Sequence, residues 1–329
     1  MRPVRPRQLG RFDVLAKIAG GGLSTIYLGR TRDPADPPVA LKVVRHDLRD
    51  DDEITNMFLD EARLLARLVH PNIVRTLESG TADGCAFIAM ELLFGMSLSN
   101  VQRACAARKI GLHPEAIAWI GARIADALEY AHTLSDEDGR PLSIVHRDVN
   151  PENVFLGFDG DVKLIDFGLA KSAGRSRESL PGIMKGKLPY LSPEQVMQLP
   201  LDGRSDLFGL GTTLWELCTM RRLFRRSDEA GTIEAVHRGP IPDPRLFASD
   251  VPDRLATIIL RALERNRTRR HRSAAVLARE LDALLGKQRV ASAPACIAQT
   301  MRELFPLEVK RQEGWRKPVL GPLLRVARA

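Results

Sequence analysis

The sequence predicts an α+β protein with two lobes, a small β-rich lobe followed by a larger helical lobe. From residue 9 to about 90, short segments rich in β-branched residues alternate between apolar and polar positions, a pattern typical of strands. Over most of the remaining chain the apolar residues recur at helical spacing. A length of 329 residues is enough to bury a sizeable core in two lobes and to leave an extension.

The small lobe is expected to contain five strands and one helix. The strands are predicted in "FDVLAKIA", "STIYLGRT", "PPVALKVVR", "IVRTLESG" and "CAFIAMELL", and the helix in "DEITNMFLDEARLLARLV". Glu61 is the one charge on the apolar face of that helix, and Lys42 lies within the apolar strand "VALKVV". A charge in such a strand needs a partner. We therefore expect a buried Lys42–Glu61 pair; the alternative is two surface charges whose heads reach water.

The large lobe begins after a break near "FGMS". The segment "PEAIAWIGARIADALEYAH" starts with a proline, which suits the first turn of a helix, and keeps helical periodicity. Further helices are predicted in "SDLFGLGTTLWELCTM", "DRLATIILRALERN" and "SAAVLARELDALL". Beyond about residue 287, "ASAPACIAQTMRELF" predicts one more helix, followed by a basic tail. This extension is either a packed or disordered appendage or a docking or regulatory element.

Composition and charge exclude some classes of protein. The net charge of +8 and the pI of about 9.6 permit binding to nucleic acids or acidic surfaces, but no aromatic stacking platform or known module supports a nucleic-acid partner. No uncharged apolar run approaches the roughly 18 residues of a membrane span, and the first residues lack the apolar core of a secretory signal. The four cysteines show no paired spacing, so a cytoplasmic location is expected.

The stretch "HRDVNPEN" places an acid, Asp148, five positions before an amide, Asn153. The next residues, "VFLGFDGDVKLIDFG", contain two apolar strands on either side of an Asp-Gly pair, which predicts a hairpin. A hairpin would return Asp166 to the side of Asn153. Carboxylate and amide oxygens suit Mg²⁺, which leaves Asp148 as a base. The alternative is a turn whose polar residues only cap helices.

A glycine-rich turn between two strands, "IAGGGLSTIY", indicates the same chemistry, because bare backbone can approach a polyphosphate there. Such a turn is weak evidence on its own. It supports a phosphate-binding role here because the same chain also has the predicted Lys42–Glu61 pair and the acidic hairpin.

Taken in order, the motifs "HPNIV", "MEL", "HRDVNPEN", "DFGLA", "PYLSPEQ" and "SDLFGLG" resemble the protein kinase family, and most closely the bacterial (Hanks-type) serine/threonine kinases, here with an atypical catalytic loop. The resemblance runs from about residue 10 to 285. It implies a two-lobed protein-kinase fold with these parts: a flexible N-terminus (1–9), a small lobe (10–90), a hinge (91–96), a large lobe (97–285) and a C-terminal extension (286–329).

The resemblance also implies an activity: transfer of the γ-phosphate of ATP to Ser and Thr hydroxyls of proteins, the chain itself included. Mg²⁺ is the expected metal, with Mn²⁺ a substitute. Asp148 would be the base, Lys42 held by Glu61 would orient the α- and β-phosphates, and Asn153 with Asp166 would hold the metal.

The nucleotide-binding residues that the resemblance implies are Ile18, Gly20, Gly21, Gly22, Ile26, Ala40, Lys42, Met90, Glu91, Leu93 and Phe155. Met90 would be the gatekeeper, Glu91 and Leu93 would offer hinge backbone to adenine, and Ile26, Ala40 and Phe155 would sandwich the ring. Outside the site, Asp206 should anchor the catalytic loop. Glu194 should pair with an arginine, for which Arg270 fits better than Arg267, Arg269 or Arg272.

Four departures from the family pattern stand out. Ala19 and Ser24 replace two glycines of the loop, and Ser97 stands where many relatives have an acid that contacts ribose. Asn150 replaces a lysine that contacts the γ-phosphate, and Lys187 replaces a threonine that contacts the catalytic aspartate and that lysine. The cation and the neutral hydrogen-bonding residue are thus exchanged. We hypothesise that Lys187 reaches back to Asp148 or the γ-phosphate; the alternative is a solvated loop lysine.

The segment between Asp166 and Glu194 carries Ser172, Ser176 and Ser179 but no threonine. Arg147 could receive a phosphate from this segment, so autophosphorylation in trans at Ser176 or Ser179 is expected, unless the segment is ordered without phosphate. The alternative function is a pseudokinase that holds a nucleotide or a partner without efficient transfer, favoured by Ala19, Asn150 and Lys187. A small-molecule phosphotransferase is less consistent with "PYLSPEQ", which resembles a protein-substrate platform.

Overall fold

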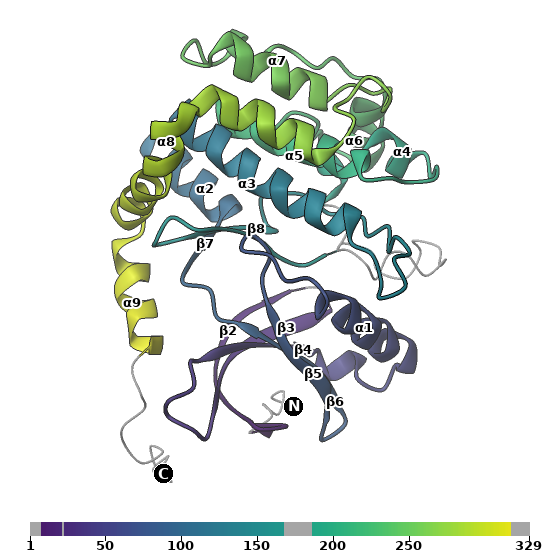
Figure 1. Cartoon of the computed structure of the whole chain (residues 1–329), viewed down its shortest axis with the longest axis vertical. Coiled ribbons are helices and arrows are strands. Elements are labelled where there is room, and N and C mark those ends of the chain that lie inside the picture. The colour runs from purple at the N-terminus through teal and green to yellow at the C-terminus, as the bar shows by residue number, and fades with distance from the viewer. Residues whose placement is uncertain (1–7, 22, 168–185, 317–329) are drawn as a thin grey trace.

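The computed structural model describes residues 8–21, 23–167 and 186–316, and it has the two predicted lobes. In Figure 1 the curled sheet and α1 form the lower lobe and helices α2 to α8 form the upper lobe, with β7 and β8 at the junction and α9 descending from α8 toward the sheet. The α+β prediction with a β-rich first lobe and a helical second lobe is therefore confirmed.

The small lobe is built on a six-stranded sheet in the order β1-β2-β3-β4-β6-β5. Its elements are β1 (Gln8–Leu9), β2 (Phe12–Gly21), β3 (Ser24–Thr31), β4 (Val39–Val44), α1 (Asp52–Leu65), β5 (Thr76–Ala82) and β6 (Cys85–Glu91). Side chains of β4 alternate between two apolar clusters. Leu41 packs with Phe12 on one face, whereas Ala40 packs with Phe58 of α1 on the other. Because of this alternation, Lys42 lies on the α1 side of the sheet.

Helix α1 begins at a capped residue, because the Asp51 carboxylate accepts the backbone N–H groups of Glu53 and Ile54 at 3.0 and 3.1 Å. It ends at Leu65, earlier than the predicted stretch. Its buried face holds Phe58, Glu61, Ala62 and Leu65. The apolar periodicity read from the sequence therefore places Glu61 toward the sheet.

The large lobe packs around α3 and α5. Its elements are β7 (Gly95–Ser97), α2 (Leu98–Arg108), α3 (Pro114–Thr133), β8 (Val154–Gly157), β9 (Val162–Leu164), α4 (Pro193–Val196), α5 (Arg204–Thr219), α6 (Glu229–His237), α7 (Asp253–Ala262), α8 (Ala274–Leu304) and α9 (Pro306–Arg316). Short 3-10 helices span His46–Leu48, Leu188–Tyr190 and Pro244–Leu246. Helix α5 is buried along nearly its whole length, and α8 lies along α3 (Figure 1).

The hairpin predicted after Asn153 is present as β8 and β9, which form a three-stranded sheet with β7. Gly160 at the turn has φ of +94°, and a Cβ there would lie 2.0 Å from the carbonyl oxygen of Pro294 in α8. Glycine is thus required twice, by the backbone angle and by the close approach of α8.

The structure adds elements that the sequence did not predict. Strands β1 and β7 are too short for a periodicity to show, and α6 buries only Thr232, Ala235 and Val236. As far as residue 316, the extension, predicted as one helix, contains two: α8 continues past a kink at Gly286, where φ is +68°, and α9 follows. In the described part of the chain, no helix is both long and apolar enough to cross a membrane.

Candidate active site

The loop before β8 is anchored by Asp206, in the first turn of α5. Its carboxylate accepts the backbone N–H groups of His146 at 2.8 Å and Arg147 at 2.7 Å, and it lies 2.7 Å from Nε2 of His132. Arg147 has φ of +64°, an angle that an L residue adopts only when its surroundings hold it. The prediction that Asp206 anchors this loop is confirmed.

Asp148 is held by two asparagines from its own loop. Asn150 Nδ2 donates to Asp148 Oδ1 at 3.1 Å, and Asn153 Nδ2 donates to Asp148 Oδ2 at 3.0 Å. Both amides also donate to the Asp148 carbonyl, at 2.9 and 2.8 Å. Asn150 Oδ1 accepts the N–H of Glu152 at 2.8 Å. Asn150 therefore stabilises the loop around Asp148, because its neutral amide group can both donate and accept hydrogen bonds.

The β8–β9 hairpin returns Asp166 to this loop. The N–H of Ile165 donates to the carbonyl of Asn153 at 2.9 Å, which joins the two ends of the hairpin. The next residue but one, Phe167, is buried and its ring lies 4.4 Å from that of His146. The expected approach of Asp166 to the catalytic loop thus follows from the hairpin geometry.

Lys42 connects the small lobe to this hairpin. Its ammonium lies 3.3 Å from Glu61 Oε1 and 2.9 Å from Asp166 Oδ1, with the lysine side chain only 11% exposed. The predicted Lys42–Glu61 pair is therefore present, and the surface-charge alternative is excluded. The same ammonium also reaches Asp166 on the large lobe, so one cation spans β4, α1 and the end of β9.

The charges of this group follow from burial and contact. Burial alone would lower the pKa of Lys42, but the carboxylates of Asp166 and Glu61 outweigh it and raise the pKa above its ordinary value. The Lys42 ammonium in turn lowers the pKa of Asp166. Burial raises the pKa of Glu61 despite Lys42. Lys42 and Asp166 are thus both ionised at neutral pH, as phosphate and metal binding require.

Lys187 completes the surroundings of Asp148. Its ammonium contacts Asp148 Oδ2, from the residue just before the 3-10 helix Leu188–Tyr190. Its charge also contributes, after Lys42, to the lowered pKa of Asp166. The contact matches one of the two targets hypothesised from the sequence, and it is not the contact of a solvated loop lysine.

Five of the eleven expected nucleotide residues lie together. Ile18, Ile26, Ala40, Met90 and Leu93 belong to one apolar cluster that also includes Ile165, next to Asp166. Gly20 and Gly21 pair with Thr25 and Ser24 at the end of the β2–β3 ladder, and Gly22 lies outside the described residues. Phe155 is half-buried on β8, with Ser97 as its partner in β7, and is not part of that cluster.

Glu91 in the hinge and Ser97 just after it have structural uses that the sequence did not reveal. Glu91 Oε1 accepts Lys163 Nζ and the N–H of Arg75, both at 2.8 Å, which ties the hinge to β9. Ser97 caps α2, because its Oγ accepts the N–H of Asn100 at 3.4 Å. The cap gives Ser97 a role where many family members carry an acid.

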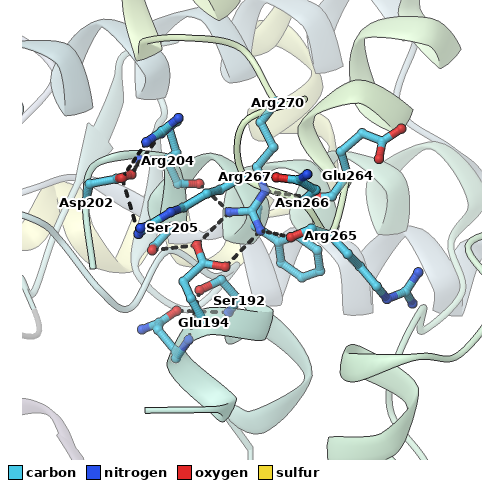
Figure 2. Close-up of polar contacts among 12 residues, drawn as sticks. Ser192, Glu194, Asp202, Arg204, Ser205, Glu264, Arg265, Asn266, Arg267 and Arg270 are labelled. Carbon is cyan, nitrogen blue, oxygen red and sulfur yellow. Dashed lines mark hydrogen bonds and ion pairs between the residues drawn. The ribbon is translucent and has the colours of Figure 1, made fainter. Parts of the chain in front are cut away.

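The expected partner of Glu194 is confirmed as Arg270, which makes a two-pronged ion pair with Oε1 at 2.7 Å and Oε2 at 2.9 Å (Figure 2). Ser205 donates to the same carboxylate at 2.7 Å. Although burial opposes ionisation, the Arg270 guanidinium holds the pKa of Glu194 below its ordinary value. Arg267 instead lies 3.4 Å from Asp202.

The expected phosphorylation sites Ser176 and Ser179, with Ser172, lie outside the described residues. Their proposed receiver is described. Nε of Arg147 is buried and has no hydrogen-bond partner within the part of the chain that the structure describes.

The family can be decided from these features together with comparison to known proteins. The model of the protein kinase domain family matches residues 12–281. The chain belongs to the protein kinase family. The two-lobed kinase fold is likewise shown by a crystal structure of the Mycobacterium tuberculosis PknI kinase domain, with a TM-score of 0.61 and 27% identity over 83% of this chain and 96% of that one.

Three relatives within the kinase family come from bacteria. Tyrosine-protein kinase MasK of Myxococcus xanthus is 33% identical over 316 residues, 95% of this chain and 49% of that protein. Serine/threonine-protein kinase PrkC of Bacillus subtilis is 32% identical over 80% of this chain and 39% of that protein. Serine/threonine-protein kinase PknL of Mycobacterium tuberculosis is 34% identical over 83% and 65%. The chain spans about half the length of these relatives, and the resemblance to bacterial serine/threonine kinases is confirmed.

Proposed function

We propose that this kinase domain transfers the γ-phosphate of ATP to hydroxyl groups of proteins, itself included. The observation that carries the proposal is the convergence of Lys42, Glu61 and Asp166 on one ion-paired group, beside the loop in which Asn153 contacts Asp148. Residues from both lobes meet there, and their types are those that phosphoryl transfer needs.

The donor set fits Mg²⁺ and nucleotide. Asp166 supplies a carboxylate and Asn153 an amide oxygen, because the contacts of Asn153 with Asp148 use its nitrogen. The apolar cluster of Ile18, Ile26 and Ala40 suits a purine ring. When bound, the metal neutralises negative charge on the phosphates. Mn²⁺, with similar ligand preferences, is a proposed substitute.

Within the proposed reaction each side chain has one task. Lys42, held by Glu61, orients the α- and β-phosphates, while Asp148 accepts the proton of the attacking hydroxyl. Lys187 lies against Asp148 and supplies the positive charge that Asn150 lacks. Such positioning and charge neutralisation account for most of the rate enhancement in phosphoryl transfer.

The four free cysteines suit a reducing compartment, for which we propose the cytoplasm.

A second function, nucleotide or partner binding without transfer, is favoured by one observation. Asn150, Asn153 and Lys187 together contact both carboxylate oxygens of Asp148. These donors compete with a substrate hydroxyl for the carboxylate oxygens of Asp148. If these donors keep a substrate hydroxyl away from Asp148 when nucleotide is bound, the domain binds nucleotide without transfer and is a pseudokinase.

Transfer of radiolabelled phosphate from ATP to the chain and to casein separates the two functions. We expect Mg²⁺-dependent label in both proteins, and none above background with Asp148→Asn. Analysis of the labelled amino acids then assigns Ser, Thr or Tyr, and mass spectrometry examines Ser176 and Ser179. Nucleotide binding in a thermal-shift assay without label above the Asp148→Asn control would contradict the transferase and support the pseudokinase.

A further inference from the structure

Helix α9 runs from the large lobe past the hinge to the small lobe. Figure 1 shows it at the side of the molecule opposite α1, descending from α8 toward the sheet. Val309 packs against the core of the large lobe, whereas Trp315, two turns further along, packs against the apolar cluster of the small lobe. Arg30 on β3 donates to the carbonyl of Trp315 at 2.7 Å. One short helix therefore contacts both lobes.

The middle of α9 is joined to the hinge by a single side chain, Gln312. Its Oε1 accepts the N–H of Gly95 at 2.9 Å, and its Nε2 donates to the carbonyl of the same glycine at 3.0 Å. Gln312 is only 5% exposed, although most of α9 is polar. A buried amide that satisfies both backbone groups of one residue is a specific contact, because either group alone would be left without a partner.

The glycine that Gln312 holds sits at the end of the hinge, where the chain enters β7. Gly95 lies opposite Gly157 of β8, so close that a Cβ would be 2.0 Å from the carbonyl oxygen of Leu156. On its other side, Phe94 accepts the N–H of Phe158 at 2.9 Å, and its ring lies 4.1 Å from the guanidinium of Arg316. The hinge is thus held between the β8–β9 hairpin and α9.

We propose that Gln312 is a positioning residue for the nucleotide site, acting through the hinge backbone. The inference rests on the proposed function, since Glu91 and Leu93, just before Gly95, are the residues proposed to meet adenine. Trp315 packs against the same cluster as Ile18 and Ile26, which line the proposed purine site. With α9 in place the hinge is ordered before the nucleotide arrives, so binding does not have to order it.

The inference is tested with Gln312→Met, which keeps the length of the side chain and removes both hydrogen bonds. Glu313→Ala is the matched control, because Glu313 is the exposed neighbour on the same helix. Binding of a fluorescent ADP analogue is measured in an Asp148→Asn background. We expect Gln312→Met to raise the Kd about tenfold, equivalent to about 1.4 kcal/mol, and Glu313→Ala to leave it unchanged.

Kinetics on the otherwise wild-type chain supply a readout that a general loss of structure would not produce. Gln312→Met should raise KM for ATP by a similar factor while kcat and KM for casein stay within twofold of wild type. Gln312→Glu retains an acceptor for the Gly95 N–H and should give an intermediate Kd. It also provides a folded comparison if the methionine variant melts at a much lower temperature.

The outcomes separate this inference from the proposed function. If both Gln312 variants bind the analogue as tightly as Glu313→Ala, Gln312 has no positioning role. If kcat and both KM values change together, the effect is on general stability and the inference is wrong. If the wild-type chain itself binds no nucleotide, the proposed function is wrong as well.

Discussion

Asp148 is the residue on which the atypical features of this kinase domain converge. In related kinases a lysine and a threonine flank the corresponding acid; here Asn150 and Lys187 occupy those positions. Asn150 hydrogen-bonds within the loop, and Lys187 brings the charge from the segment before α4. Asn150 and Lys187 lie nearly forty residues apart in the sequence but meet at the carboxylate of Asp148, as the hypothesised exchange requires.

At the residue scale, Lys187→Ala is expected to lower kcat about 10²-fold, by analogy with removal of one group that stabilises transition-state charge. The double variant Lys187→Thr with Asn150→Lys restores the usual arrangement and should recover much of the loss. Phosphate transfer to casein measures both, with the exposed Arg254→Ala on α7 as a control for lost charge. Wild-type turnover in Lys187→Ala, while Asp148→Ala is inactive, would refute the exchange.

At the scale of elements, α4 is held in place by a buried ion pair rather than by its own length. It spans only Pro193–Val196, with Ser192 and Gln195 forming a capping box at its start. Arg270, from the loop between α7 and α8, reaches Glu194 and also donates to the carbonyls of Arg204 and Arg265 (Figure 2). One guanidinium thus connects α4, the start of α5 and the loop that follows α7.

Removing that guanidinium should be costly. Arg270→Met is expected to lower the free energy of unfolding by about 3–5 kcal/mol, because the carboxylate of Glu194 would stay buried without its partner. Urea denaturation followed by circular dichroism measures the loss. Arg63→Met removes one partner of the exposed Arg63–Asp60 pair and should change the midpoint little. Equal effects of the two substitutions would show that burial does not decide the contribution of Arg270.

At the scale of the whole molecule, buried histidines couple stability to pH. Burial lowers the pKa of His146 below its ordinary value, despite Asp206 and Asp148 nearby. Burial likewise lowers the pKa values of His70 and His271. Because these side chains are harder to protonate in the folded chain, acid favours the unfolded state, which takes up the protons.

The free energy of unfolding should therefore fall as pH drops below about 6.5, the ordinary pKa of histidine. His146 alone contributes a slope of at most about 1.4 kcal/mol per pH unit between its lowered folded pKa and 6.5. Urea midpoints at pH 7.0, 6.0 and 5.5 measure the slope. His146→Asn should reduce it. A stability that is constant over this range would contradict the assignment.

Much of this arrangement was predictable because local patterns determine it. The period-two pattern of β4 placed Lys42 among apolar residues, and the helical spacing of α1 placed Glu61 on the face that meets them. The Asp-Gly pair at the β8–β9 turn predicted the return of Asp166. Elements without a strong pattern were missed: β7 has three residues, and Gly286 divides a helix whose apolar spacing continues on both sides.

The sequence by itself determined the two lobes and the family, and it indicated the residues that we propose for phosphoryl transfer, because each of these depends on short-range spacing. Only the tertiary structure decided which partners distant residues take. Arg270 rather than its neighbours reaches Glu194, Lys187 reaches Asp148, and Gln312 reaches Gly95. These contacts join residues tens to hundreds of positions apart. Their geometry depends on how whole elements pack, and no local pattern records it.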